Sequence, residues 1–459
     1  MQYQLTLSAG AIEQLQRDHS GELPQVTRYE TGLCRLPKRV EWLVGETLRP
    51  ANDQESSPQL VAVCGDHSEF LEAEFERQKT SLPDAPPTVL LALGTGRSSG
   101  KVGAACKLNR PVGIDLIKIV MPGLPCITFD PQGGRPMDGV LKQTRENELS
   151  TSQGALSFPW QEIWSRTIGA LGEEVFRRIT ELHVAVVGCG RSGSQLAAAL
   201  SRLGIMQITL IDPDQVELHN IGEMTAVTTA EVGCNKAEAV ARHLGRFGPV
   251  TGYPDSVPLL HAVPESILSL PGLIAAKQAD VLFCCVDDAA ARVATAFIAT
   301  LYLRPLIDVG TGITIADVSD ESATSPANSM RPQMGADVRL LVPGDRCLMC
   351  LGGVSGFEEA RRTLLSGSAA PVDGDWQRQR AGSLYSLNGI AIQLAMRLFE
   401  DFLSARIEQS TWLRMNIASP AEPSLQRLTP ARSQDCEFCS VNGRGDAGVR
   451  DLSRILVAL

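Results

Sequence analysis

Four cysteines stand in two close pairs, Cys347-x-x-Cys350 and Cys436-x-x-Cys439. Two such pairs of thiolates are typical ligands of one tetrahedral zinc ion that ties distant segments of a chain together. Four thiolates leave no open coordination position for water, so we expect a structural rather than a catalytic Zn²⁺ site. The alternative is a set of unrelated buried cysteines.

A glycine-rich turn of the order G-x-G-x-x-G is formed by Gly188, Gly190 and Gly193. An apolar run precedes it, an Ala/Leu-rich run follows it, and the next apolar run ends at Asp212. Glycines let a phosphate approach the backbone, and an acid at the end of the next strand can bind a ribose. The spacing predicts a strand-turn-helix-strand unit that binds a nucleotide.

A later apolar run leads directly into a pair of acids, Asp287 and Asp288. Ligands of parallel sheets bind at the carboxyl ends of the strands. We therefore expect the glycine turn, Asp212 and Asp287 to converge on one pocket.

The elements that must position these residues alternate between strand and helix. This alternation predicts an α/β fold with a Rossmann-like, mainly parallel sheet and helices on both faces. A covering helix is expected just before the first strand, over residues 164–183. The expected strands are 184–187, 207–211, 280–286 and 305–310, and the expected helices end near 203, 245 and 301.

Residues 1–150 read as a separate α+β accessory domain, and residues 151–459 as the domain with the sites described above. Strands are expected at 59–64, 88–93, 114–121 and 126–129, helices at 10–18 and 68–79, and a linker at 130–153. The segment 94–101 looks like a phosphate-binding P-loop, but Thr95 and Val102 break that pattern, so a surface loop is expected.

Composition narrows the class of protein. The 459 residues carry a net charge of -10, which argues against nucleic-acid binding by phosphate neutralisation. The apolar fraction of 44% is that of an ordinary globular protein. The sequence shows neither a signal peptide nor a run of eighteen apolar residues, so we expect no membrane span and a reducing cytoplasm.

Taken together, these motifs resemble the ThiF/MoeB/HesA superfamily, the ubiquitin-activating-enzyme-like adenylyltransferases. The resemblance covers about residues 160–439 and follows the family's order of motifs. The matching residues are Arg166, the glycine loop with Arg191, Asp212, Asp214, Asn220, Lys236, Cys285 with Asp287 and Asp288, Arg292, and the four cysteines.

The resemblance implies an enzyme that binds ATP and Mg²⁺ and adenylates the C-terminal tail of a ubiquitin-like protein. Catalytic roles fall on Arg166, Lys236 and Asp287, with Asp287 also holding Mg²⁺ and Arg166 reaching the γ-phosphate from the other subunit of a homodimer. ATP contacts are implied for the glycine loop, Arg191, Asp212, Asp214, Asn220, Asp288 and Arg292. For single residues, blander roles stay open: Asp214 as a turn cap, Lys236 as a solvated helix residue, and Arg292 as a surface partner of Asp288.

Two departures from the family pattern stand out. Glu223 replaces an arginine of the family, and an acid facing ATP phosphates would repel them. Either this turn is rebuilt, or another cation such as Arg191 in the glycine loop takes over. Furthermore, no cysteine lies between Cys350 and Cys436, where thioester-forming members carry one. The adenylate then passes to the nucleophile of a partner, such as a conjugating-enzyme-like acceptor, or an acyl-enzyme forms elsewhere. Candidates are Cys234 and the hydroxyls of Ser366, Ser368, Ser383 and Ser386.

The first unit also resembles, loosely, JAB/MPN metalloprotease domains, through an apolar strand, a polar loop and the turn Pro122–Pro125. The loop at 94–97 has no histidine to bind a catalytic zinc, so an inactive domain is expected. Two other functions remain open for the whole chain: a nicotinamide-dependent oxidoreductase, which would not need Lys236 or the cysteines, and a non-catalytic scaffold.

Overall fold

The computed structural model describes most of the chain from residue 160 onward and the strands before it. The described residues are 2–8, 11, 26–35, 39–45, 59–64, 89–93, 105–108, 117–120, 127–129, 160–248, 259–315, 332–352, 354, 357–366, 384–417, 423–433 and 435–452. The expected helices at 10–18 and 68–79, the loop 94–101 and the linker 130–153 lie outside this set, apart from residue 11.

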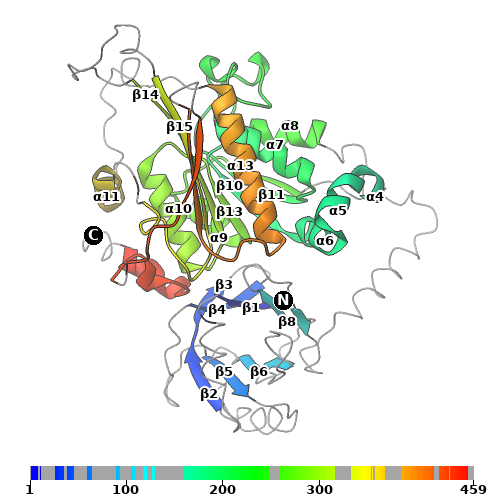
Figure 1. Cartoon of the computed structure of the whole chain (residues 1–459), viewed down its shortest axis with the longest axis vertical. Coiled ribbons are helices and arrows are strands. Elements are labelled where there is room, and N and C mark those ends of the chain that lie inside the picture. Colours follow the sequence, from blue (N-terminus) through cyan, green and yellow to red (C-terminus); the bar gives the residue numbers. More distant parts are fainter. Residues whose placement is uncertain are drawn as a thin grey trace.

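An eight-stranded sheet forms the centre of the larger part of the molecule (Figure 1). Its strand order is β12-β11-β10-β13-β14-β15-β16-β17, with parallel pairing from β12 to β14 and antiparallel pairing beyond. The strands are β10 (His183–Val187), β11 (Gln207–Ile211), β12 (Leu259–Val263), β13 (Val281–Cys284), β14 (Leu306–Ile315), β15 (Pro332–Leu341), β16 (Thr411–Asn416) and β17 (Ser424–Leu428). The predicted fold class is confirmed.

Helices cover both faces of this sheet because its central strands are apolar on both sides. In β10 every residue is buried, with Val184 and Val186 in one core and Ala185 and Val187 in the other. The first core is closed by α7 (Arg191–Leu203), α8 (Lys236–Phe247) and α13 (Tyr385–Leu403), and the second by α9 (Leu270–Gln278) and α10 (Ala289–Leu301).

The order of connection reverses between β10 and β13. From β10 the chain proceeds outward through β11 to β12, and it then returns to place β13 and β14 on the other side of β10. At such a switch point the two loops leave the sheet in opposite directions and open a crevice at the carboxyl ends of the strands. The glycine turn follows β10 and the Asp287 turn follows β13, so both border this crevice.

The covering segment before β10 is broken rather than one helix. It consists of α4 (Trp160–Ile163), α5 (Ser165–Leu171) and α6 (Glu173–Glu181). Gly172 separates the last two with φ of 87°, a left-handed value that ends α5. The expectation of a single helix was therefore wrong at this glycine. Among the described residues, no helix is both long and apolar enough to cross a membrane.

The strands before residue 130 form two smaller sheets, ordered β3-β4-β1-β8-β9 and β2-β5-β6-β7. The bounds are β1 (Gln2–Leu7), β2 (Val26–Glu30), β3 (Gly32–Arg35), β4 (Arg39–Val44), β5 (Gln59–Cys64), β6 (Val89–Leu93), β7 (Ala105–Leu108), β8 (Ile117–Val120) and β9 (Ile127–Phe129). The four strands expected there are confirmed at β5, β6, β8 and β9 within the residues that the structure describes.

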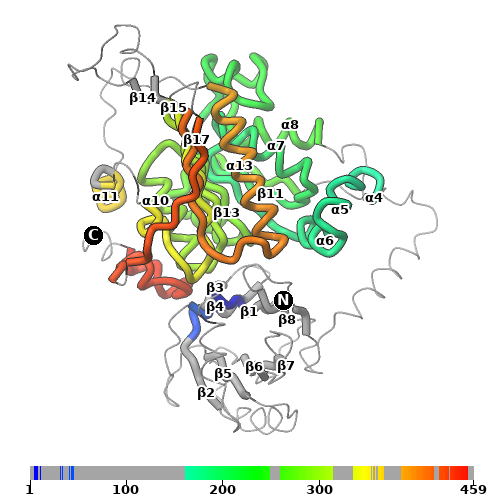
Figure 2. The backbone as a smooth tube through the Cα atoms, in the orientation of Figure 1, coloured from blue at the N-terminus to red at the C-terminus, as the bar shows by residue number. Residues whose placement is uncertain are grey.

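The first of these sheets contacts the larger part of the molecule. Figure 1 shows β3 and β4 beside the red C-terminal segment, which Figure 2 traces down from β17 and which contains the short helix η5 (Asp446–Asp451). Glu41 of β4 forms a 2.7 Å ion pair with Arg304, and both side chains are almost fully buried, at 0% and 2% exposure. Cys34 and Leu43 belong to the same apolar core as Phe438 and Val441. This contact joins the two parts through both charge and apolar packing.

Candidate nucleotide and metal sites

The glycine turn brings the backbone of β10 and α7 close together. Gly188 has φ of 87°, and a Cβ there would lie 2.9 Å from the backbone of Cys285. A Cβ on Gly193 would collide with the carbonyl oxygen of Gly188. At Gly190, the N-cap of α7, a Cβ would meet nothing within 4 Å. The first and third glycines thus allow close packing, and the second leaves space at a helix N-terminus, where a phosphate is favoured.

Asp212 follows β11 and is turned toward the glycine turn. Its carboxylate accepts hydrogen bonds from the backbone N–H of Cys189 at 2.6 Å and of Asp214 at 2.9 Å. Burial raises the pKa of this carboxyl above its ordinary value, against the lowering effect of the two hydrogen bonds. The two predicted nucleotide-binding features therefore lie in direct contact.

Lys236 is the first residue of α8, and its ammonium lies 2.9 Å from the carboxylate of Asp214. The side chain of Asn235, the N-cap of α8, donates to the carbonyl oxygens of Asp212 and Asp214. The structure thus brings Asp212, Asp214 and Lys236 together. Asp214 pairs with Lys236 here, and the sequence analysis missed Asn235, whose side chain binds the backbone of both aspartates.

The two acids after β13 differ in their surroundings. Asp288 caps α10, since its carboxylate accepts the backbone N–H of Ala291 at 2.6 Å. Asp287 is exposed and has no hydrogen-bond or ion-pair partner within the part of the chain that the structure describes. An unpaired carboxylate at the end of a central strand suits a hard cation such as Mg²⁺, which keeps several waters and takes few protein ligands.

Asn220 and Glu223 lie in the turn after β11. Asn220 is buried, and its side-chain oxygen accepts the backbone N–H of Glu217 at 2.9 Å, which holds the turn. Glu223 reaches the other way, to Arg191 of the glycine loop, with 3.4 Å between Oε2 and Nε. Glu223 stands where the family has an arginine. Its negative charge is balanced in this structure by Arg191, the cation that the sequence analysis suggested.

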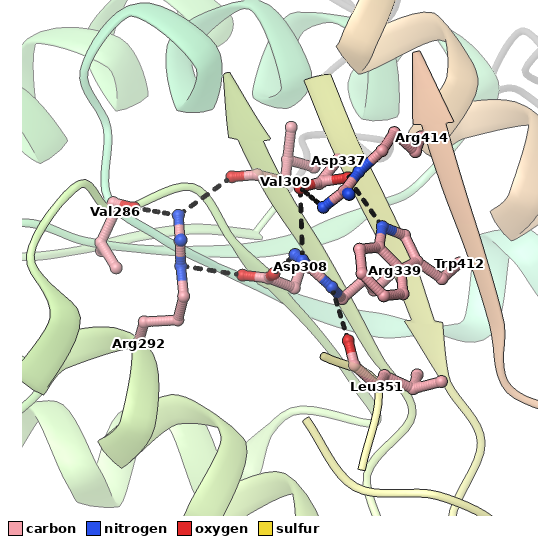
Figure 3. A network of polar contacts seen from close by, with 9 residues as sticks. All are labelled: Val286, Arg292, Asp308, Val309, Asp337, Arg339, Leu351, Trp412 and Arg414. Carbon is pink, nitrogen blue, oxygen red and sulfur yellow. Dashed lines mark hydrogen bonds and ion pairs between the residues drawn. The ribbon is translucent and has the colours of Figure 1, made fainter. Parts of the chain in front are cut away.

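The side chain of Arg292 points into the sheet and not toward solvent. Its guanidinium lies 3.1 Å from Asp308 of β14 and donates to the carbonyl oxygen of Val286 at 2.7 Å (Figure 3). It pairs with Asp308 and not with Asp288. The buried acid Asp308, which stands between the apolar residues Ile307 and Val309, was missed by the sequence analysis, although a charge inside such a run is an unusual signal.

Arg166 is not brought to the crevice within this chain. It is exposed on α5 and lines a surface cavity of about 300 Å³ with Leu203 at the C-terminal end of α7. The glycine turn lies at the other end of that helix, about 20 Å away. A role at the nucleotide would therefore require a second copy of the chain.

The four cysteines come together as predicted. The Sγ atoms of the four cysteines all lie within 4.8 Å of one another. These cysteines are Cys347, Cys350, Cys436 and Cys439. The Sγ–Sγ distances of 3.5 Å for Cys347–Cys436 and 3.8 Å for Cys350–Cys439 can be compared with roughly 3.8 Å around a tetrahedral zinc. The donor set and its spacing fit Zn²⁺, which would tie the turn after β15 to the C-terminal segment.

The candidate acyl acceptors are only partly described. Ser386 is exposed in the first turn of α13, and Cys234 is partly buried two residues before Lys236. Ser368 and Ser383 lie outside the described residues, and of Ser366 only the backbone is described.

Comparison with known proteins finds a family and several partial relatives. The model of the family described as "ThiF family" matches residues 164–367. The tRNA threonylcarbamoyladenosine dehydratase of Escherichia coli (strain K12) is 35% identical over 94 residues, 20% of this chain and 35% of that protein. The ATP-dependent ubiquitin transferase-like protein Cap2 of Enterobacter hormaechei subsp. hoffmannii is 26% identical over 283 residues, 59% of this chain and 44% of that protein.

Ubiquitin-like modifier-activating enzyme 5 of Drosophila grimshawi is 32% identical over 124 residues, 26% of this chain and 31% of that protein. This chain thus spans less than half of the length of each of these three relatives. Among solved structures, E. coli MccB with ATP is similar over 60% of this chain and 74% of that one, with 20% identity and a TM-score of 0.43. Residues 164–367 of this chain are thus similar to the ThiF family.

Proposed function

We propose that this protein uses ATP to adenylate the C-terminal carboxylate of a ubiquitin-like protein. The observation that carries the proposal is the grouping of the glycine turn, Asp212 and Lys236 beside Asp287 at the carboxyl ends of β10, β11 and β13. The similarity of residues 164–367 to the ThiF family supports it, as do the names of relatives that act on ubiquitin-like proteins.

In the proposed reaction, a carboxylate oxygen of the substrate attacks the α-phosphorus of ATP, and the bond to the bridging oxygen breaks. The products are an acyl-adenylate and pyrophosphate, which carries away the bonding electron pair. The protein's contribution is positioning and neutralisation of charge, since no covalent help is needed.

Each residue then has a defined task. The glycine turn and the N-terminus of α7 receive phosphate oxygens, and Asp212 accepts hydrogen bonds from the ribose hydroxyls. Lys236 exchanges Asp214 for the α-phosphate as negative charge develops there. Asp287 would hold Mg²⁺, which when bound neutralises the charge of the pyrophosphate leaving group.

The remaining expectations are part of the same proposal. Arg166 acts at the γ-phosphate of a second subunit in a homodimer, and residues 1–150 form an accessory domain. The chain has no cysteine between Cys350 and Cys436. The acyl-adenylate therefore passes to a different nucleophile.

The experiment is ATP–pyrophosphate exchange with Mg²⁺ and a ubiquitin-like protein, followed by intact-mass analysis of both proteins. Label should enter ATP only when the ubiquitin-like protein has a free C-terminal carboxylate, and a C-terminally amidated copy is the matched control. Exchange that is absent from the wild type, or equal with the amidated copy, would overturn the proposal. A fluorescence change on adding NADH instead would favour the oxidoreductase.

A further inference from the structure

The turn that carries Asp287 is held from inside the protein by Arg292. The Nη2 atom of Arg292 donates to the carbonyl oxygen of Val286, the residue just before Asp287, at 2.7 Å. The same nitrogen makes a longer contact of 3.5 Å to the carbonyl oxygen of Val309 (Figure 3). The guanidinium therefore bridges the turn after β13 and the neighbouring strand β14.

Arg292 is itself held by an acid that a second arginine shares. Asp308 is 0% exposed, and its two carboxylate oxygens lie 3.1 Å from Nε of Arg292 and 3.1 Å from Nη1 of Arg339. The pair Arg292–Asp308 is at ion-pair distance without hydrogen-bond alignment, so charge attraction rather than a directed bond joins it. Both arginines share this one buried carboxylate.

Arg339 connects the network to the cysteine cluster. Its Nε donates to the carbonyl oxygen of Leu351, the residue after Cys350, at 3.0 Å. Its guanidinium also lies over the ring of Trp412, 4.5 Å from the ring centroid. Its Nη2 atom lies 3.4 Å from Oδ2 of Asp337. A continuous chain of contacts thus runs from the turn before Asp287 to the segment of the predicted zinc site.

The position of Arg292 has a physical consequence for its role. Its side chain is 17% exposed, and its nitrogens face Val286, Val309 and Asp308. A guanidinium removed from water in this way is costly unless its charge is paired, and leaving Asp308 to reach a nucleotide phosphate would take the charged partner from one of its two buried carboxylate oxygens. The arrangement favours indirect action through Val286 over direct contact with ATP.

We propose that Arg292 is a positioning residue that fixes the turn bearing Asp287 in the geometry needed to bind the divalent cation of ATP, with Asp308 and Arg339 supporting it from the side of the cysteine cluster. This inference rests on the proposed function in one respect, because it takes Asp287 as the cation ligand. It replaces the direct contact between Arg292 and ATP that the family resemblance implies.

The test uses the full chain with Mn²⁺ as the probe and a non-hydrolysable ATP analogue, and measures free Mn²⁺ by electron paramagnetic resonance. Arg292→Met should weaken Mn²⁺ binding in the ternary complex about 10- to 100-fold, the range typical for removal of a residue that orients a metal ligand. Affinity for the analogue without metal should stay the same. Arg292→Lys keeps the charge but loses the planar guanidinium, so its Mn²⁺ affinity should lie between those of the wild type and Arg292→Met.

Arg304→Met is the matched control, because it also breaks a buried arginine–carboxylate pair but lies at the contact with β4. It should lower stability without changing Mn²⁺ affinity. Arg339→Met acts only through Asp308 and should give a smaller loss of Mn²⁺ affinity than Arg292→Met. Wild-type Mn²⁺ affinity in Arg292→Met overturns the inference, and so does a loss in Arg304→Met as large as that in Arg292→Met.

Hydrogen–deuterium exchange of the peptide 281–289 separates this inference from the proposed function. If the wild type binds no ATP, the proposed function fails, yet Arg292→Met should still speed exchange in this peptide and Arg304→Met should not. If Arg292→Met does not fold, Arg292→Lys decides both measurements. Unchanged exchange and unchanged Mn²⁺ affinity in a folded Arg292→Lys variant overturn the inference.

Discussion

Glu223 and Arg191 form an ion pair between the turn after β11 and the first turn of α7, with 3.4 Å between Oε2 and Nε. Both side chains are about one-third exposed, at 32% and 35%. The guanidinium that could meet a nucleotide phosphate at the glycine turn is thus already engaged by an acid. Phosphate binding must compete with this pair.

Removal of the Glu223 charge should tighten ATP binding. Glu223→Gln removes the repulsion of the phosphates and releases Arg191, and an exposed pair of this kind is worth about 0–1 kcal/mol, so the Kd should fall up to about fivefold. Isothermal titration with ATP at two salt concentrations measures it. Glu181→Gln breaks an exposed pair with Arg177 on α6 and is the matched control. A higher Kd for ATP in Glu223→Gln would contradict this prediction and would show that Glu223 stabilises the site.

Lys236 should matter for the reaction and hardly at all for stability. A cation in the first turn of a helix opposes the helix dipole, so Lys236→Met should leave the melting temperature unchanged or slightly higher. The rate of pyrophosphate exchange should fall about 10²- to 10³-fold, as when one transition-state donor is lost. Arg246→Ala, in the last turn of the same helix, should leave the rate unchanged. A Lys236→Met variant with full exchange activity would rule out the assigned role.

The raised pKa of Asp212 gives nucleoside binding a pH dependence. Because burial raises the pKa in the folded protein, the folded chain keeps this proton over a pH range in which the unfolded chain has lost it. Stability from this group is therefore complete below the ordinary aspartate pKa and is lost as pH rises through the folded pKa. The protonated carboxyl is a poorer acceptor for ribose hydroxyls, so adenosine binding should weaken in acid already above the ordinary aspartate range. Asp212→Asn should bind adenosine weakly at every pH; a wild-type affinity that is flat with pH contradicts the assignment.

The cysteine cluster should carry one zinc ion per chain. Cys436→Ser should lose the metal, as measured by elemental analysis of the purified protein, and should lower the unfolding temperature, because the ion joins two distant segments. Cys234→Ser, outside the cluster, is the control and should keep the metal. A wild-type protein without zinc, or a Cys436→Ser variant as stable as the wild type, would refute a structural zinc.

The parts of this fold that were predictable have strong local signals. The apolar run at β11 and the helix from Ala289 to Leu301 were expected at the bounds observed, because periodicity and flanking residues define them. β12 and α9 were missed. β12 is an edge strand in which only the last residue, Val263, is buried, and α9 begins with Leu-Pro-Gly, which reads as a turn.

The site was predictable where a motif requires a residue type. The glycine turn, Asp212 and Lys236 are examples, and their contacts follow from strand order. The pair Arg292–Asp308 was not predictable, because it depends on the side-by-side placement of α10 and β14, which no local pattern encodes. For Glu223, the sequence analysis named Arg191 as a cation that could compensate for its charge, but it did not predict the ion pair between the two side chains.

The buried pair between Glu41 and Arg304 also sets the limits of an independent folding unit. A truncated protein that began near residue 160 would contain the whole eight-stranded sheet, yet it would leave Arg304 without its carboxylate. Removing one partner of a buried pair costs about 3–5 kcal/mol, and the apolar contacts of Cys34 and Leu43 would be lost as well. The region that matches the family model is thus not the part of the chain that we expect to fold stably by itself. That part also includes β3 and β4.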